Sequence, residues 1–181
     1  MIQKMTVDDI VKEWLQAMQE AFQDVSRVPL KRGVKELLNF LHTNCPMILC
    51  YVATSNIKSV VEDALKRRGI AEFFEGILTS TDVERPKPDP VIYLEAARRG
   101  FNHIRSEVKP NQVLVIEDSY DCAKKAKSIG MQVCAVYDSY TYRSGDDAWK
   151  QFALEADYKV KQSFDEVLLP LQSCFLYAPV K

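Results

Sequence analysis

The sequence lacks the features that mark secreted, membrane-spanning and nucleic-acid-binding proteins. Its five cysteines are odd in number and include no Cys-x-x-Cys pair, which indicates a reduced, cytoplasmic protein rather than a disulfide framework. No apolar run reaches transmembrane length, and the N-terminal stretch around Asp8 and Asp9 lacks a signal-peptide core. The net charge of −1 gives no electrostatic case for nucleic acid or an anionic membrane as a partner. The two histidines, His42 and His103, are isolated and fit neither a metal cluster nor a catalytic triad.

The composition, 47% apolar and 27% charged over 181 residues, suits one domain, or one domain with a small appendage, that builds an ordinary core. Helical and strand patterns alternate along it. Strands are expected at 46–53, 75–79, 113–116, 131–136 and 156–160, and helices at about 6–23, 33–43, 57–69, 90–100, 119–130 and from 163 onward. Strands that alternate with helices imply right-handed crossovers, so the expected fold is an α/β, doubly wound parallel sheet.

The stretch 113–119 carries the strongest chemical signal, because four apolar residues run directly into Glu117 and Asp118. A continuous apolar run predicts a strand buried on both faces, and ligands bind beyond the carboxyl ends of such strands. Adjacent carboxylates repel each other and need a cation or a proton between them. Hard oxygen ligands suit Mg²⁺, so the pair predicts a magnesium site. The alternative is a solvated acidic turn after an ordinary strand.

A second polar cluster follows the strand at 46–53, where Thr54, Ser55 and Asn56 stand directly before a helix. Hydroxyls and free backbone N–H groups at a helix start offer donors to an anion such as phosphate. The alternative is simple capping of the helix by Ser55 or Asn56.

A third candidate is Lys87, in a loop at 80–90 that contains three prolines within five residues. Such a segment is stiff and can hold a lysine ammonium in place as a point charge for phosphate. The alternative is an ordinary surface lysine. Asp82 is expected to order this loop, and Asp89 with Pro90 to begin the next helix.

The remaining segments predict packing rather than chemistry. The N-terminal helix, capped by Thr6, has a wide apolar stripe that needs a partner surface. The Tyr-rich loop at 137–147 is expected on the surface rather than as a stacking platform. Ser163 and Glu166 predict a capping box at the start of the last helix, and the apolar tail from Cys174 is expected to pack on the body.

Taken together, the three polar sites resemble the haloacid dehalogenase superfamily of phosphohydrolases, in particular its beta-phosphoglucomutase-like branch. Thr54 resembles the second motif, which hydrogen-bonds the phosphoryl group, and Lys87 within Lys-Pro-Asp-Pro resembles the third, a lysine that steadies negative charge. Glu117 and Asp118 resemble the acidic pair of the fourth motif, which holds Mg²⁺. The resemblance covers about residues 29–168 and implies a Rossmannoid core at 29–181 with the remnant of a helical cap at 1–28.

The printed sequence departs from this family at the first motif, Asp-x-Asp-x-Thr, which carries the nucleophile on the first, central strand. A smaller departure is Cys122, where the family commonly has Gly. Three outcomes are open for the missing strand: the flanking strands pair directly, a partner chain or the apolar tail fills the gap, or the chain is a fragment of a longer protein. The last is the favoured expectation.

The resemblance implies a Mg²⁺-dependent phosphatase of a small phosphorylated metabolite such as a sugar phosphate. Thr54 and Lys87 are the expected catalytic residues, Ser55 and Asn56 further phosphate ligands, and Glu117 and Asp118 the metal ligands. The chain as printed is expected to be weakly active or inactive and to bind Mg²⁺ weakly. The alternatives are a phosphosugar mutase, and a non-catalytic paralogue that binds phosphate, Mg²⁺ or a protein partner. Self-association through the gap in the sheet is a further expectation.

Overall fold

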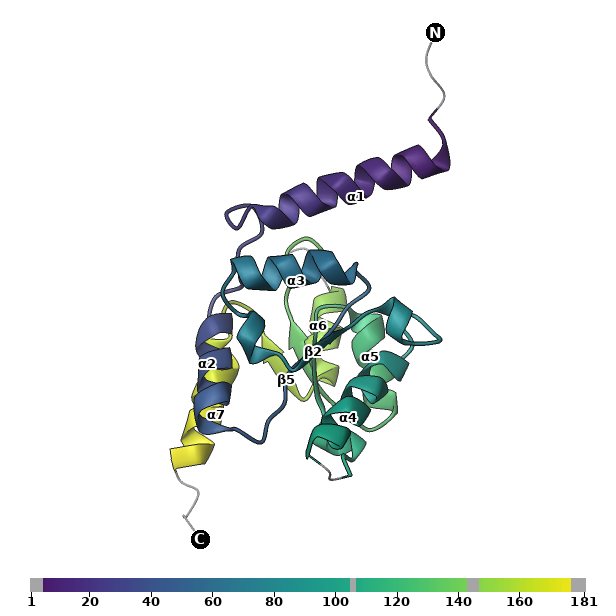
Figure 1. Cartoon of the computed structure of the whole chain (residues 1–181). Coiled ribbons are helices and arrows are strands. Elements are labelled where there is room, and N and C mark those ends of the chain that lie inside the picture. The colour runs from purple at the N-terminus through teal and green to yellow at the C-terminus, as the bar shows by residue number, and fades with distance from the viewer. Residues whose placement is uncertain (1–4, 105–106, 143–146, 177–181) are drawn as a thin grey trace.

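The computed structural model describes residues 5–104, 107–142 and 147–176 and shows parallel strands that alternate with helices (Figure 1). The strands are β1 (Tyr51–Ala53), β2 (Gly76–Leu78), β3 (Leu114–Glu117), β4 (Gln132–Val136) and β5 (Tyr158–Val160). The helices are α1 (Val7–Gln23), α2 (Val34–Asn44), α3 (Lys58–Arg67), α4 (Val91–Ile104), α5 (Tyr120–Ser128), α6 (Asp147–Glu155) and α7 (Asp165–Leu176). Short 3-10 turns lie at Ala71–Phe73, Ser80–Asp82 and Pro110–Gln112. The expected α/β fold with parallel strands is confirmed.

The strands form two small sheets rather than one. β1 pairs with β2, and β3 pairs with β4, which pairs with β5, all in parallel. Within the described residues no strand pairs with the inner edge of β1 or of β3, so the alternative that these two strands close up and pair directly is wrong. β1 is also shorter than the predicted strand at 46–53. Met47 and Ile48 precede it with 74% and 49% of their surface exposed.

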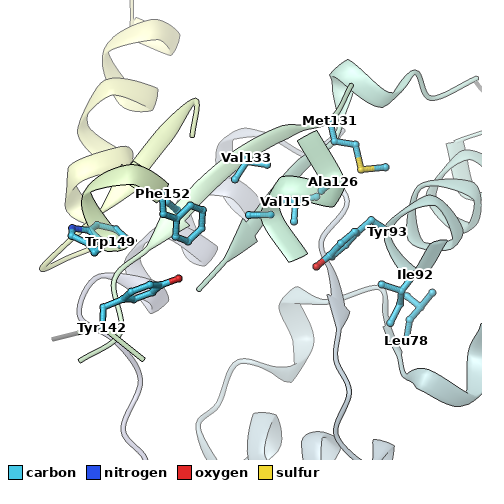
Figure 2. Close-up of a cluster of buried hydrophobic side chains, with 12 residues drawn as sticks. Leu78, Ile92, Tyr93, Val115, Ala126, Met131, Val133, Tyr142, Trp149 and Phe152 are labelled. Carbon is cyan, nitrogen blue, oxygen red and sulfur yellow. The ribbon is translucent and has the colours of Figure 1, made fainter. Parts of the chain in front are cut away.

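The larger core cluster lies between one face of the β3–β4–β5 sheet and helices α4, α5 and α6 (Figure 2). Helix α5 places Ala123 and Ala126 against the sheet, and these small side chains let the helix backbone approach closely. Helix α6 contributes Trp149 and Phe152, the latter 1% exposed. Helix α6 was not among the elements expected from the sequence, which place no helix between the Tyr-rich loop and the strand at 156–160.

That loop is also less exposed than predicted. Tyr140 is fully accessible, but Tyr142 is 5% exposed and packs against Trp149 and Phe152, while Tyr137 is half-buried. The expectation of a surface loop is therefore wrong for Tyr142, whose ring fills space over the sheet. The hydroxyl of Tyr142 donates to the backbone carbonyl of Asp118 at 2.9 Å, so this packing also supports the predicted site.

A second core cluster lies on the opposite face of the sheet, where β4 and β5 meet α2 and α7. Figure 1 shows α2 and α7 side by side at one flank of the molecule. Gly33 begins α2 with φ +80°, and a Cβ there would lie 2.9 Å from Ser163 Oγ and from the backbone nitrogen of Asp165. Glu166 accepts backbone N–H bonds from 161 to 163, which confirms the predicted capping of α7.

Helix α1 projects along one side of the molecule, above α3 (Figure 1). Thr6 and Asp9 form the expected capping box at its start. No residue of α1 is buried, and Ile10 and Trp14 of the apolar stripe are 54% and 60% exposed. Its anchor is Arg68 at the end of α3, which donates to the carbonyl oxygens of Phe22 and Val28.

The strand before the acidic pair is buried on one face only. Val115 and Glu117 point into the larger core, whereas Leu114 and Ile116 are 46% and 45% exposed. The prediction of burial on both faces is wrong because nothing in the described chain covers this second face beside the gap. The side chains of the apolar tail from Cys174 are not among those that the structure describes, so the prediction that this tail packs on the body concerns a part outside the described residues. None of the described helices combines the length and apolarity that a membrane span needs.

Candidate active site

The three predicted polar sites line one cavity of about 500 Å³ at the carboxyl ends of β1 and β3. β1 delivers Thr54 and Ser55, β3 delivers Glu117 and Asp118, and the proline-rich loop delivers Lys87. The structure brings these five residues together, as expected for parallel strands whose carboxyl ends meet at one edge. Asn56 does not line the cavity. The full lining consists of Ala53, Thr54, Ser55, Lys87, Pro88, Ile116, Glu117, Asp118, Ser119, Asp121 and Cys122.

Lys87 and Glu117 form an ion pair through Glu117 Oε1, with side chains that are 16% and 7% exposed. The same oxygen accepts a 2.6 Å hydrogen bond from the hydroxyl of Tyr93, and Oε2 accepts a 3.3 Å bond from the backbone N–H of Ser119. A buried carboxylate needs this compensation, because an unpaired charge away from water costs several kcal/mol. Both oxygens of Glu117 are thus engaged within the protein.

Asp118 has the opposite environment. Its side chain is exposed at the cavity, and partial loss of hydration together with the neighbouring Glu117 charge raises the pKa of its carboxyl. Asp138 adds to this increase and Lys31 opposes it. Of the two adjacent carboxylates, Glu117 is therefore paired with Lys87. Asp118 faces the cavity and is repelled by the Glu117 charge, and a bound cation would relieve this repulsion.

The turn after β1 presents its hydroxyls to the cavity. The backbone N–H of Thr54 continues the β1–β2 pairing by donating to the carbonyl of Leu78 at 2.9 Å. Thr54 Oγ1 accepts a 3.0 Å bond from the N–H of Asn56, which leaves the hydroxyl proton as a donor. Helix α3 begins after Ile57 and has no side-chain cap, so the alternative that Ser55 or Asn56 caps it is wrong.

The loop that carries Lys87 is held at both ends. Asp82 accepts from the backbone N–H of Thr79 at 2.9 Å and from Arg99 at 2.9 Å, which confirms its expected role in ordering the loop. These bonds lower the pKa of Asp82 to about 2. At the other end, Asp89 accepts from the N–H of Val91 at 3.0 Å and so begins α4, as predicted. The helix continues past the predicted end near Gly100 to Ile104.

Tyr93 and Asp121, both at the site, were not identified from the sequence. Tyr93 lies in α4, 5% exposed, and its position suggested only a core aromatic. Cys122 and Asp121 lie in the first turn of α5 and line the cavity. Asp121 could have been found, because it follows Glu117 and Asp118 within one helical turn. No local pattern distinguishes Tyr93 from the other apolar residues of its helix.

The donor set of the cavity fits Mg²⁺ in part. Mg²⁺ keeps several waters and takes one or two protein carboxylates together with phosphate oxygens. Asp118 suits this role, since its carboxylate is accessible and forms no ion pair with another described residue. Glu117 suits it less directly, since Lys87, Tyr93 and Ser119 already engage its oxygens. Among the described residues no group of three or more His, Cys, Asp or Glu side chains is placed to hold a metal, so water and substrate would supply most ligands.

A parallel α/β core with a polar cavity at the carboxyl ends of its strands defines a Rossmannoid domain. Comparison with known proteins gives the family. The chain belongs to the haloacid dehalogenase-like hydrolases, whose family model matches residues 1–136.

The curated proteins that this chain resembles include phosphatases. The chain is 27% identical over 114 residues to pyrophosphatase PpaX of Bacillus velezensis, covering 63% of this chain and 48% of that protein. It is 32% identical over 100 residues to the phosphorylated carbohydrates phosphatase of Thermotoga maritima, covering 55% of this chain and 43% of that protein. The chain thus spans about half the length of the curated relatives it matches.

Solved structures support the fold. The "putative beta-phosphoglucomutase" of Thermotoga maritima superimposes with a TM-score of 0.70 at 26% identity, covering 95% of this chain and 72% of that one. A predicted phosphoglycolate phosphatase of Haemophilus somnus gives a TM-score of 0.71 at 20% identity, covering 94% and 70%. At that lower identity the second similarity concerns the fold alone.

Proposed function

We propose that this chain carries the phosphate-binding and countercharge part of a Mg²⁺-dependent phosphatase that acts on a small phosphorylated metabolite, such as a sugar phosphate, in the cytoplasm. The observation that carries the proposal is the convergence of Thr54, Lys87 and Asp118 on one cavity. A hydroxyl donor and an ammonium are complementary to a phosphoryl group, and an accessible carboxylate is complementary to the metal ion that binds with it. The phosphatase relatives favour the same class of reaction.

In the proposed mechanism the residues of this chain bind and stabilise charge. Phosphoryl transfer spreads negative charge over the equatorial oxygens, so positioning and countercharge make up most of the catalysis. Thr54 and Ser55 would donate hydrogen bonds to those oxygens, with Asn56 supporting the turn through its bond to Thr54. Lys87 would oppose the developing charge. Mg²⁺, held by Asp118 with Glu117 beside it, would supply further countercharge when bound.

The nucleophile is the part of this mechanism for which the printed sequence offers no candidate, since it contains no Asp-x-Asp-x-Thr. Glu117 is held by three internal donors and cannot attack phosphorus without breaking them. We therefore expect very low turnover of an aryl phosphate by the printed chain with Mg²⁺. An in-frame Asp-x-Asp-x-Thr upstream of Met1 in the gene would favour the complete phosphatase or the related phosphosugar mutase.

The engaged state of Glu117 also favours a second candidate, a non-catalytic chain that binds phosphate and Mg²⁺. The two candidates share the binding site and differ in turnover. Robust hydrolysis by the printed chain that disappears in Lys87→Met would rule out the non-catalytic candidate. Phosphate binding without turnover, in a gene that lacks the upstream motif, would favour it.

Binding is tested by NMR titration of the chain with inorganic phosphate and, separately, with Mg²⁺. We expect Thr54→Val to weaken phosphate binding, whereas Thr81→Val, in the same fold but outside the cavity lining, leaves it unchanged. We expect Asp118→Asn to weaken Mg²⁺ binding more than Asp121→Asn does. Phosphate shifts that map away from 53–56, 87 and 117–119 would contradict the proposed site.

We further propose that two copies of the chain associate through the gap between the sheets. The inner edge of β3 has no pairing strand within the described residues, and the face of β3 beside it exposes about half of Leu114 and Ile116. Unpaired strand edges with apolar side chains favour pairing with another chain. Light scattering on a sizing column is expected to show a dimer that Ile116→Lys dissociates and that Leu154→Lys, on exposed α6 surface, does not. A monomer at all concentrations would contradict this.

A further inference from the structure

Tyr93 occupies an unusual position between the core and the cavity. It lies in the first turn of α4, where Ile92 and Tyr93 both face the sheet and are 1% and 5% exposed. Figure 2 shows Tyr93 reaching from α4 toward the strand that carries Val115. Its ring belongs to the larger core cluster, while its hydroxyl lies 2.6 Å from Oε1 of Glu117, a residue that lines the cavity.

The same side chain contacts both members of the buried ion pair. The hydroxyl shares Glu117 Oε1 with Lys87, and the Lys87 ammonium lies 5.1 Å from the centre of the Tyr93 ring. A cation this close to an aromatic face is attracted by the ring quadrupole. The ring and the carboxylate therefore contact two sides of the ammonium. Its other N–H groups point away from both and can donate to a further acceptor. Lys87 itself lines the cavity.

We propose that Tyr93 is a positioning residue that holds Lys87 in place for an incoming phosphate. Its hydroxyl donates to Glu117 and takes up part of the carboxylate charge, so that Glu117 does not fully neutralise Lys87. Its ring lies against the Lys87 ammonium. This inference rests on the proposed function in one respect, namely that the anion which Lys87 meets in the cavity is phosphate.

The chain provides a matched control for the Tyr93–Glu117 bond. Tyr120 donates to Glu155 Oε2 at 2.8 Å, which is the same kind of tyrosine–glutamate hydrogen bond, but on the outer surface where it contacts neither Lys87 nor Glu117. Tyr93→Phe and Tyr120→Phe each delete a tyrosine hydroxyl and its bond to a glutamate, and Tyr120→Phe also removes the acceptor of a 3.2 Å bond from Gln151 Nε2. Only the first removes a donor from the oxygen that binds Lys87.

The first measurement is the order parameter of the Lys87 Cε methylene, obtained by NMR relaxation in lysine-labelled protein without phosphate. We expect it to fall by about a third in Tyr93→Phe and to stay unchanged in Tyr120→Phe. An unchanged value in Tyr93→Phe overturns the inference. Should Tyr93→Phe fail to fold, Glu117→Gln keeps the shape of the acceptor but weakens both of its bonds, and the same loss of order is expected there.

The second measurement is the affinity for inorganic phosphate at pH 7. We expect Tyr93→Phe to raise Kd about fivefold, since the hydrogen bond to a charged group that it deletes is among the stronger kinds. In a Glu117→Gln background the same substitution should have no further effect, because Tyr93 acts through Glu117. An equal loss in both backgrounds would assign Tyr93 an independent role and overturn the inference.

The two measurements separate the inference from the proposed function. If the wild-type chain shows no phosphate binding while Lys87 loses order in Tyr93→Phe, the phosphate site is wrong and the positioning role of Tyr93 stands. If phosphate binds and Lys87 is equally ordered in both proteins, the phosphate site stands and the role of Tyr93 is wrong.

Discussion

Lys87 and Glu117 lie thirty positions apart in the sequence and form an ion pair in which both side chains are largely shielded from water. Removing one partner of such a pair leaves the other charge buried and unpaired, which lowers the stability of the fold by more than the intact pair contributes to it. We therefore expect Lys87→Met to lower the free energy of unfolding by about 3 kcal/mol, measured by urea denaturation at pH 7.

Lys127→Met is the control for this prediction. Lys127 pairs with Asp157 at 2.8 Å, with side chains that are 42% and 37% exposed. Exposed pairs contribute less than about 1 kcal/mol, so a small loss is expected. In addition, the double variant Lys87→Met/Glu117→Gln should recover part of the stability lost in Lys87→Met. Equal losses in the two lysine variants would show that Glu117 reaches water or another cation.

The Asp82–Arg99 ion pair predicts a contribution to stability that is lost in acid. The backbone N–H of Thr79 and the Arg99 guanidinium lower the folded-state pKa of Asp82 from 3.8 to about 2. Because the folded-state pKa lies below the unfolded one, the stabilisation is complete above about pH 5 and is lost as the pH falls toward 2. It amounts to about 1 kcal/mol after allowance for solvent screening.

Urea unfolding of the wild type and Asp82→Asn between pH 6 and pH 2 tests this. The difference in stability between the two proteins should be largest near pH 6 and shrink below pH 4. Asp63→Asn, which removes an exposed partner of Arg67 within one helix, should show a smaller difference. A gap between wild type and Asp82→Asn that stays constant down to pH 2 would mean that Asp82 titrates normally in the folded protein.

Arg68 is predicted to hold α1 on the body of the protein. Its guanidinium donates to the carbonyl oxygens of Phe22 and Val28, while no residue of α1 is buried. Arg68→Ala should therefore lower the local free energy of opening of α1 by about 2 kcal/mol and leave the core unaffected. Hydrogen exchange would show faster exchange at 7–23 and unchanged exchange in β3 and β4. The control is Arg67→Ala, whose guanidinium pairs with Asp63 of the same helix, α3.

Gly33 and Gly69 both have positive φ, but their surroundings differ. A Cβ at Gly33 would lie 2.9 Å from the backbone nitrogen of Asp165, whereas at Gly69 the nearest atom is the flexible Lys35 ammonium at 3.7 Å. We expect Gly69→Ala to cost about 1 kcal/mol, from the backbone conformation alone. Gly33→Ala should cost about 3 kcal/mol, since the start of α7 must also move. Thermal or urea unfolding of both variants would measure the difference, and equal costs would contradict the close approach of α2 and α7.

Much of the fold and of the candidate site was predictable from local sequence patterns. The alternation of apolar strands with amphipathic helices specifies a parallel sheet, and parallel strands end at one edge. For that reason Thr54 and Glu117, each directly after a strand, could be expected at a common site. The order of Thr54, Lys87 and the acidic pair along the chain then indicated the family.

The misses came from contacts between distant segments. Helix α6 and Tyr142 are buried because they pack against a face of the sheet. That face is built from distant segments, so the local sequence does not show that it will be available to them. The predicted strand at 46–53 is shorter in the structure, Tyr51–Ala53, because among the described strands only β2 pairs with it. The apolar residues of β3 could be recognised as strand residues, but the exposure of Leu114 and Ile116 follows from the lack of a described neighbour on that side.

The sequence by itself determined which residue types stand at the ends of the strands, because periodicity and turn composition act over a few residues. Only the tertiary structure decided how the two adjacent carboxylates differ. Glu117 points into the core, where Lys87 and Tyr93 from another segment compensate its charge, and Asp118 points into the cavity. Successive side chains along a strand face opposite directions, so one carboxylate of the pair points inward and the other outward. Which of the two contacts a lysine depends on the position of Lys87, in a loop thirty residues away in the sequence.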